Sequence, residues 1–166
     1  MTNSPFALLT PKTTEETLQA GAALARAVTN GLLQPGDIIQ LKGDLGAGKS
    51  TFMRGLIRAL LGAQTDVPSP TFALVHPYDT TPPLWHMDLY RLEDPEDLWE
   101  LGIEEAFEEA ICFIEWPEKA GTLLPEEALS LEITTQKEHR EIGFFAQGAG
   151  WLARINAIKS ALGLPA

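Results

Sequence analysis

The stretch "GDLGAGKST", from Gly43 to Thr51, combines three glycines with a lysine and two hydroxyl side chains. Glycine has no Cβ and adopts positive φ at little cost, so Gly43, Gly46 and Gly48 allow the backbone to curl around one centre. Several backbone N–H groups then point at that centre. The stretch therefore predicts a site for an anion.

The spacing of this stretch fits the phosphate-binding pattern G-x-x-x-x-G-K-[ST]. In a working loop of this kind the lysine, here Lys49, reaches the β- and γ-phosphates, and the next hydroxyl, here Ser50, binds Mg²⁺. We expect the phosphates of a nucleotide to lie along the whole loop, on Gly43, Asp44, Leu45, Gly46, Ala47, Gly48, Lys49, Ser50 and Thr51.

A glycine-rich turn could match this pattern by chance, and the flanking sequence decides between the two interpretations. Residues 37–42, "DIIQLK", predict a short strand, and residues 50–61 have apolar side chains at helical spacing. A phosphate loop requires a strand before it and a helix after it, because the helix N-terminus attracts phosphate. The context favours nucleotide binding.

The rest of the chain predicts an alternation of helices and strands. A capping-box pattern at Thr13 opens a helix that stops at Gly31, and Asp94 caps a helix that continues to Glu109. Strands are expected at 72–76, 84–90, 111–116, 129–135 and 140–146, and a last helix at 151–163.

Strands interleaved with helices predict an α/β fold. We expect a three-layer P-loop NTPase sandwich around a mainly parallel sheet. The last two strands pair as a hairpin around 136–139 and would add antiparallel edge strands.

Length and composition indicate one domain, residues 1–166. No apolar run approaches the roughly 20 residues that span a membrane, and the N-terminus lacks the basic region and apolar core of a signal peptide. The single cysteine, Cys112, lies in an apolar run and is expected to be a buried thiol in a reducing compartment. The expected location is the cytoplasm.

The charge of the chain argues against direct contact with nucleic acid. The chain has 23 acidic and 12 basic residues, which gives a formal net charge of −11. Affinity for phosphate backbones depends on clustered Lys and Arg side chains. We therefore expect no strong nucleic-acid binding by the chain alone.

Nucleotide hydrolysis needs carboxylates for Mg²⁺ and for the attacking water in addition to the loop. Asp88 follows the apolar run 84–87 and Glu115 follows the run 111–114, so both are expected at the carboxyl ends of strands, beside the phosphates. Burying such a carboxylate is costly without a cation. The alternative for each is a structural role, as the cap of the next helix or as the partner of Arg91.

Other side chains near these positions have two interpretations each. Thr71, in "SPTF", is a candidate hydroxyl for Mg²⁺ or the γ-phosphate, or else a solvent-facing strand residue. Trp116 either walls off the site or closes the core. His86 is expected to be packed or hydrogen-bonded, since no other His or Cys stands at metal-site spacing. The acidic side chains of 94–109 are expected to face solvent.

Missing motifs narrow the choice among P-loop proteins. The chain has no Asn-Lys-x-Asp, which disfavours a GTPase, and no Leu-Ser-Gly-Gly-Gln, which disfavours a transporter-type ATPase. A small-molecule kinase would place several arginines in a lid and an acceptor site, but only Arg140 and Arg154 follow Arg91, far apart in sequence. An ATPase without an evident catalytic arginine remains.

The ordered motifs "GDLGAGKST", "SPTF", "HMDLYRL" and "IEWPEKA" resemble those of one family, the bacterial tRNA threonylcarbamoyladenosine biosynthesis ATPases TsaE, also known as YjeE. The resemblance extends from about Glu16 to Arg140, and "DLYRL" with "IEWPE" is far more specific than the phosphate loop. It implies a small P-loop ATPase that supports the threonylcarbamoyl transferase complex, a transferase subunit and its paralogous partner. That complex modifies adenosine 37 in tRNAs that read ANN codons.

The same resemblance implies roles for individual residues. Lys49 corresponds to the loop lysine of the family and Ser50 to its Mg²⁺ hydroxyl, usually a threonine. Asp88 corresponds to the aspartate of "DLYR", and Glu115 with Trp116 to the Glu-Trp pair. Hydrolysis of ATP is thus implied, with Mg²⁺ on Ser50 and one carboxylate, and a water positioned by the other. A nucleotide-dependent assembly switch with negligible turnover and a small-molecule kinase remain as alternatives.

Overall fold

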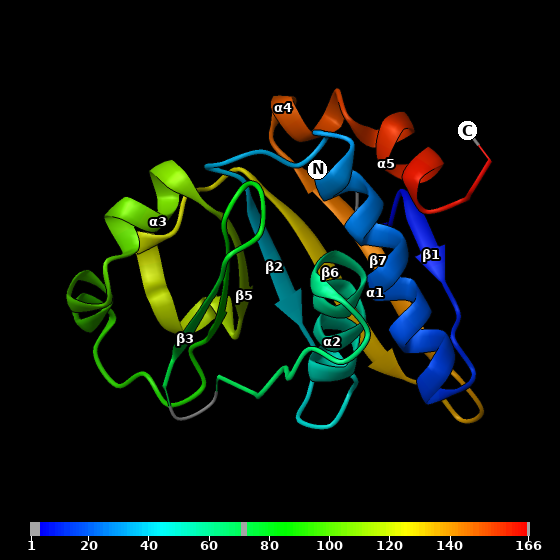
Figure 1. Ribbon diagram of the computed structural model, residues 1–166, viewed down its shortest axis with the longest axis horizontal. Coiled ribbons are helices and arrows are strands. Elements are labelled where there is room, and N and C mark those ends of the chain that lie inside the picture. The colour runs from blue at the N-terminus through cyan, green and yellow to red at the C-terminus, as the bar shows by residue number, and fades with distance from the viewer. Residues whose placement is uncertain (1–3, 71–72, 166) are drawn as a thin grey trace.

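The structure is a computed structural model that describes residues 4–70 and 73–165. One seven-stranded sheet lies at its centre, and α1 and α2 lie side by side against it (Figure 1). The strands are β1 (Ala7–Leu9), β2 (Ile38–Lys42), β3 (Val75–Tyr78), β4 (Leu84–Asp88), β5 (Ile111–Glu115), β6 (Ala128–Thr135) and β7 (Arg140–Gln147). The α-helices are α1 (Thr14–Thr29), α2 (Lys49–Leu61), α3 (Ile103–Glu109), α4 (Ala149–Leu152) and α5 (Ile155–Ala161), and the 3₁₀ segments are η1 (Pro95–Leu101) and η2 (Pro117–Leu123).

The strand order across the sheet is β1-β7-β6-β2-β5-β4-β3. The central strands β6, β2, β5 and β4 run parallel, whereas β3 on one edge and β7 and β1 on the other pair antiparallel. β2 and β5 are buried along nearly their whole length, as strands covered on both faces must be. The expected α/β fold with antiparallel edges is confirmed. The expectation of a mainly parallel sheet holds for its centre, since three of the six strand pairings are parallel.

Alternate side chains of the central strands point to opposite faces and build two cores. Ile39 of β2 and Phe113 of β5 belong to a core that they share with α1 and α2. Ile38 and Ile114 belong to a second core that they share with η1, α3 and η2. Helices therefore cover both faces of the central strands, which confirms the three layers.

Close packing between α1 and α2 fixes the start of α2, where the phosphate loop ends. A Cβ atom added to Gly55 would lie 2.0 Å from the carbonyl oxygen of Leu18, and one added to Gly21 would lie 2.0 Å from that of Phe52. Only glycine allows two helix backbones to approach so closely. The contact holds α2 against the helix that precedes β2.

The predicted helix start at Thr13 is confirmed, because its hydroxyl accepts a hydrogen bond from the backbone N–H of Glu16 at 3.0 Å. The single helix predicted at 94–109 is wrong. Asp94 acts as the predicted cap, but the segment that it caps is η1, which is 3₁₀. Gly102 then adopts a left-handed conformation with φ 82°, so that η1 ends before α3 begins.

The single helix predicted at 151–163 is also wrong, because α4 and α5 are separate. Arg154 lies between them with φ −99° and ψ −2°, outside the range of a regular helix. Its guanidinium forms an ion pair with Asp37, with an Nη1–Oδ2 distance of 2.6 Å. The break therefore coincides with a tether to the residue that precedes β2.

Some strand boundaries differ from the predicted ones, and β1 was not predicted. β1 has three residues, too few for an alternating pattern, and is defined by its backbone pairing with β7. The strand expected at 72–76 begins at Val75. The strand expected at 84–90 ends at Asp88, where the next N–H, of Leu89, turns to the carbonyl oxygen of Glu115 at 3.1 Å. No helix in the described part of the chain has the length and apolar character needed to span a bilayer.

Candidate functional site

The phosphate-loop stretch 43–51 lies between the carboxyl end of β2 and the first turn of α2. Gly43, Gly46 and Gly48 have φ values of 154°, 78° and 119°. Residues with a Cβ are strained at these angles. A Cβ on Gly43 would also lie 2.6 Å from the carbonyl oxygen of Ile133 in β6. The backbone therefore requires the three glycines, and the N-terminus of α2 lies where the pattern predicts phosphate.

Lys49 is the first residue of α2 and is only 5% exposed. Its Nζ donates a hydrogen bond to the carbonyl oxygen of Gly43 at 2.6 Å and lies 4.0 Å from the centroid of the Trp116 ring. Burial lowers the pKa of Lys49, and the carboxylates of Glu115 and Asp88 oppose this effect by favouring the charged form. The ammonium group thus lies across the loop in a residue largely shielded from solvent, where it would interact strongly with a phosphate.

The two predicted carboxylates lie side by side at one end of the sheet. Asp88 and Glu115 are neighbours in register on the parallel strands β4 and β5. Both are buried, with exposed fractions of 6% and 3%. Together with Lys49 and Ser50 they line one hollow of about 300 Å³ at the phosphate loop. The structure therefore brings together the residues that strand ends and the loop pattern predict.

The structural alternatives for these carboxylates also have support. The Oδ1 atom of Asp88 accepts a hydrogen bond from the backbone N–H of Tyr90 at 3.0 Å, so Asp88 caps the turn after β4. The Oε2 atom of Glu115 lies 2.5 Å from Nε2 of His86. These contacts hold one oxygen of each carboxylate in place.

His86 of β4 lies behind Glu115 and is 1% exposed. It is hydrogen-bonded to a carboxylate, as the sequence predicts, and its Nδ1 is buried with no hydrogen-bond partner among the described residues. The sequence does not predict which group it contacts, because register between β4 and β5 decides that. His86 fixes the orientation of the Glu115 carboxylate.

Trp116 adopts a left-handed backbone conformation with φ 56°, which is uncommon for a large side chain. Its ring contacts the Lys49 ammonium and also the Tyr90 ring, whose centroid is 5.0 Å away. The same ring packs on the edge of the core beneath η1, α3 and η2. Trp116 therefore lines the hollow and also packs against part of a core.

The donor set of the hollow fits Mg²⁺. The Ser50 hydroxyl and the carboxylates of Asp88 and Glu115 are hard oxygen donors, and Mg²⁺ takes one or two carboxylates together with water and phosphate oxygens. In the described residues, no group of three or more His, Cys, Asp or Glu side chains could hold a metal ion. The hard oxygen donors thus fit a cation that binds together with a nucleotide.

Sequence reasoning missed Arg140, the first residue of β7, which lines the same hollow. A Cβ on Gly48 would lie 2.8 Å from its Nη1 atom. No local pattern marks this contact, because the β6–β7 hairpin brings Arg140 back to the loop from far along the chain. Ser69 and Thr14 line the hollow as well, whereas Thr71 lies outside the described residues and stays a prediction.

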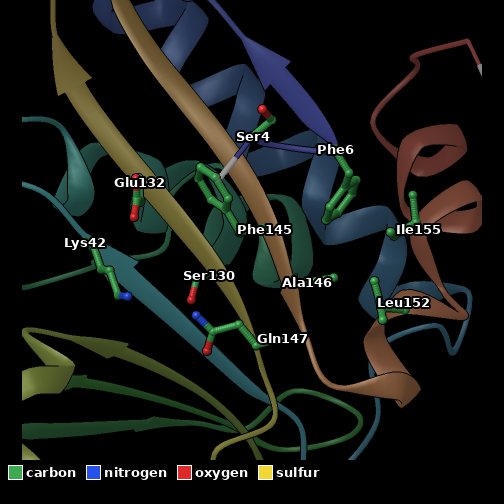
Figure 2. A pocket seen from close by; sticks show the side chains of 10 residues that line it. All are labelled: Ser4, Phe6, Lys42, Ser130, Glu132, Phe145, Ala146, Gln147, Leu152 and Ile155. Carbon is green, nitrogen blue, oxygen red and sulfur yellow. The ribbon is translucent and has the colours of Figure 1, made fainter. Parts of the chain in front are cut away.

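A different hollow, of about 270 Å³, lies on the face of β2, β6 and β7 that points away from α1 and α2 (Figure 2). Lys42 pairs with Glu132 in register there, and the Ser130 hydroxyl donates to Oε1 of Gln40 at 3.1 Å. None of the residues predicted for the site line this hollow. The predicted chemistry is therefore concentrated at the phosphate loop.

Comparison with known proteins shows which family the chain is similar to. Residues 11–142 match the family described as "Threonylcarbamoyl adenosine biosynthesis protein TsaE". A "tRNA threonylcarbamoyladenosine biosynthesis protein TsaE" from Rickettsia felis is 39% identical over 129 residues, which cover 77% of this chain and 72% of the relative. Its counterpart from Bacillus subtilis is 41% identical over 124 residues, which cover 73% of this chain and 77% of the relative.

The structure is similar to the crystal structure of Bacillus subtilis YdiB. The TM-score is 0.72 at 31% sequence identity, and the alignment covers 95% of this chain and 93% of that one. The likeness therefore extends over nearly all of both chains.

Proposed function

The chain belongs to the TsaE family of tRNA threonylcarbamoyladenosine biosynthesis proteins, and we propose that it serves this pathway as an ATP-hydrolysing accessory protein. It acts in the cytoplasm with the threonylcarbamoyl transferase complex, a transferase subunit and its paralogous partner, on adenosine 37 of tRNAs that read ANN codons. The observation that supports hydrolysis best is the pair of buried carboxylates, Asp88 and Glu115, beside Lys49.

In this proposal the phosphate loop binds the nucleotide, and the two carboxylates position the cation and the attacking water. The backbone N–H groups of the loop and the N-terminus of α2 bind the triphosphate of ATP. The Lys49 ammonium exchanges its contact with the Gly43 carbonyl oxygen for the β- and γ-phosphates, where it stabilises charge that develops during hydrolysis. Mg²⁺, which would neutralise phosphate charge when bound, would be held by Ser50 and by Asp88 or Glu115.

The carboxylate that does not hold the cation positions the attacking water. The contact with His86 supports Glu115 in this role, because it fixes the carboxylate and leaves Oε1 for a further hydrogen bond. Asp88 is fixed in a similar way by the Tyr90 N–H. Rigid carboxylates at the phosphates are what in-line attack by water requires.

Removal of one carboxylate tests the proposal. Asp88→Asn and Glu115→Gln take negative charge away from a site that binds a triphosphate, so ATP affinity should stay the same or rise. Turnover should fall by about 100-fold, because water and cation are no longer positioned. ATP affinity and kcat are measured with the transferase components present, and Glu108→Gln, an exposed carboxylate of α3, is the control.

Full turnover in either carboxylate variant would assign that residue a structural role only. The two alternative functions would give different results when phosphate release is measured in the same mixture. An assembly switch releases at most about one phosphate per protein molecule and then stops, and a small-molecule kinase transfers the phosphate to a metabolite.

A further inference from the structure

The side chains of β6 and β7 that point away from α1 and α2 contribute little to the second core, which lies beneath η1, α3 and η2. Among the described residues of these two strands, only Ala128, at the start of β6, belongs to that core. Ser130 and Glu132 of β6 and Phe145 and Gln147 of β7 instead line a hollow. The second core therefore ends at the start of β6, and the sheet face beyond it is hollowed.

Two hollows on this face form one groove. The hollow of about 270 Å³ in Figure 2 and a larger one of about 1100 Å³ share Lys42, Ala146, Gln147 and Leu152 as lining residues. The larger hollow also extends over η2 and the loop 124–127. Pockets for small molecules usually have volumes of roughly 300–1,000 Å³. This open-face groove is therefore large enough for an extended segment of protein chain.

The open-face groove has apolar side chains that a partner would remove from water. Leu152 of α4 lines both hollows and is 58% exposed. Phe6 and Ile155 lie on the same side of the smaller hollow as Leu152 (Figure 2). Leu124 and Pro125 line the larger hollow. Exposed apolar side chains gathered in a groove with a polar rim are typical of protein interaction sites.

The rim of the open-face groove is acidic. Four exposed glutamates line its hollows, and these are Glu118, Glu126, Glu127 and Glu132. Lys42 is the single basic side chain among the described lining residues. Within residues 4–70 and 73–165, the carboxylates of Glu126, Glu127 and Glu132 form no ion pair. These carboxylates are therefore available to cations of a partner.

The charge of the rim selects among partners. A chain with a net charge of −11 and an acidic groove repels a second copy of itself, an anionic lipid surface and a nucleic acid. The same field attracts a basic partner and disfavours an acidic one. Glu127 is also packed in place, since a Cβ on Gly148 would lie 2.6 Å from its Cγ atom. Charge complementarity thus favours a positively charged segment of another protein.

We infer that the open-face groove is a docking site for an extended, positively charged segment of a partner protein. Lys or Arg side chains of the segment pair with the glutamates of the rim, and an apolar side chain of the segment packs on Leu152 and Phe6. The amides of Gln40 and Gln147 offer hydrogen bonds to its backbone. The inference goes beyond the proposed function, because the groove shares no lining residue with the phosphate-loop hollow.

The test uses two panels of labelled peptides of about 12 residues, which span about 40 Å when extended. In one panel Lys or Arg residues alternate with varied Leu, Ile, Phe and Trp residues, and in the other Glu replaces every Lys and Arg. Fluorescence anisotropy at physiological ionic strength measures the affinity of each peptide for the wild type. Basic peptides should bind with a Kd of about 100 μM or tighter, and the acidic peptides should not bind.

Two variants test the groove itself. Leu152→Gln removes the apolar contact without a change of charge, and Glu126→Lys/Glu132→Lys reverses two charges of the rim. Each should weaken binding of the basic peptides by about 5-fold or more. The control, Glu104→Lys/Glu105→Lys, makes the same change of net charge on exposed side chains of α3 that do not line the groove. It should stay within about 2-fold of the wild type, because salt screens distant exposed charges.

Thermal unfolding checks that the variants are folded, and the two groove variants are independent, so one that fails to fold leaves the other as the test. No binding by any basic peptide would overturn the inference. Wild-type affinity in both groove variants, or an equal loss in the α3 control, would mean that net charge alone attracts the peptides. A wild type that sediments as a dimer, with Leu152→Gln a monomer, would assign the groove to a second copy of the chain instead.

Discussion

At the scale of single residues, the site is organised around the Lys49 ammonium. This group is buried between the carbonyl oxygen of Gly43 and the ring of Trp116, with Glu115 and Asp88 close enough to favour its charge. The left-handed backbone of Trp116 costs roughly 1–2 kcal/mol, and the centroid of its ring lies 4.0 Å from the Lys49 ammonium. We interpret this arrangement as a cation held ready for phosphate.

Lys49→Ala should lower ATP turnover by about 100-fold or more, because a preorganised cation at the phosphates stabilises the transition state by several kcal/mol. Phosphate release in the presence of the transferase components measures this effect. Lys42→Ala is the matched control, since Lys42 lies at the end of β2 and lines the hollow on the other face of the sheet. Near-normal turnover in Lys49→Ala, with unchanged folding, would reject the assignment of the loop.

Residues that a local pattern defines could be predicted from the sequence. The loop glycines, Lys49 and Ser50 follow from spacing, and Asp88 and Glu115 follow from their places at strand ends. The partners of these residues could not be predicted in the same way. The contact between His86 and Glu115 depends on strand register. The approach of Arg140 to Gly48 depends on the return of a hairpin, for which spacing along the chain contains no signal.

At the scale of elements, α1 and α2 form the support of the phosphate loop. Their backbones meet at Gly21 and Gly55, where a Cβ would come within 2.0 Å of a carbonyl oxygen on the facing helix. Helix pairs with larger residues at the contact stay 8–10 Å apart, so these two glycines set how closely α2 lies against α1. The start of α2 is fixed by this contact.

Gly55→Ala should destabilise the fold by about 2–3 kcal/mol, since the new Cβ would lie 2.0 Å from the Leu18 carbonyl oxygen and the helices must separate. The expected fall in Tm is roughly 4–12 °C for a chain of this size. Thermal unfolding measures it. Gly150→Ala is the control, because a Cβ there meets no atom within 4 Å. An equal Tm for both variants would contradict the close contact between α1 and α2.

Capping signals and apolar periodicity predicted where most elements begin. The start of α1 at the Thr13 cap and the strand before the loop are examples. The same periodicity could not reveal breaks inside an apolar pattern. Gly102 divides η1 from α3 by its left-handed backbone, and the ion pair of Arg154 with Asp37 accompanies the break between α4 and α5. Both breaks depend on tertiary contacts or on backbone angles that do not change the spacing of apolar residues.

At the scale of the whole molecule, charge and topology have separate consequences. The parallel centre of the sheet brings the phosphate loop and both carboxylates to one end. The net charge of −11 opposes contact with a polyanion. This charge supports the proposal that the protein serves tRNA modification through partner proteins that contact the RNA themselves.

The isolated protein should therefore show no salt-sensitive affinity for tRNA at physiological ionic strength. Fluorescence anisotropy with a labelled tRNA, recorded at several salt concentrations, measures this affinity. The transferase components serve as a positive control under the same conditions. Micromolar binding that weakens as salt rises would contradict the inference from charge.

The central claim is that this member of the TsaE family hydrolyses ATP continuously while it supports tRNA threonylcarbamoylation. Steady-state phosphate release by the wild type, with Mg²⁺ and with or without the transferase components, tests it most directly. The account predicts slow release by the protein alone and many phosphates per protein molecule once the components are added. Release that stops after about one phosphate per protein molecule in the complete mixture would contradict it.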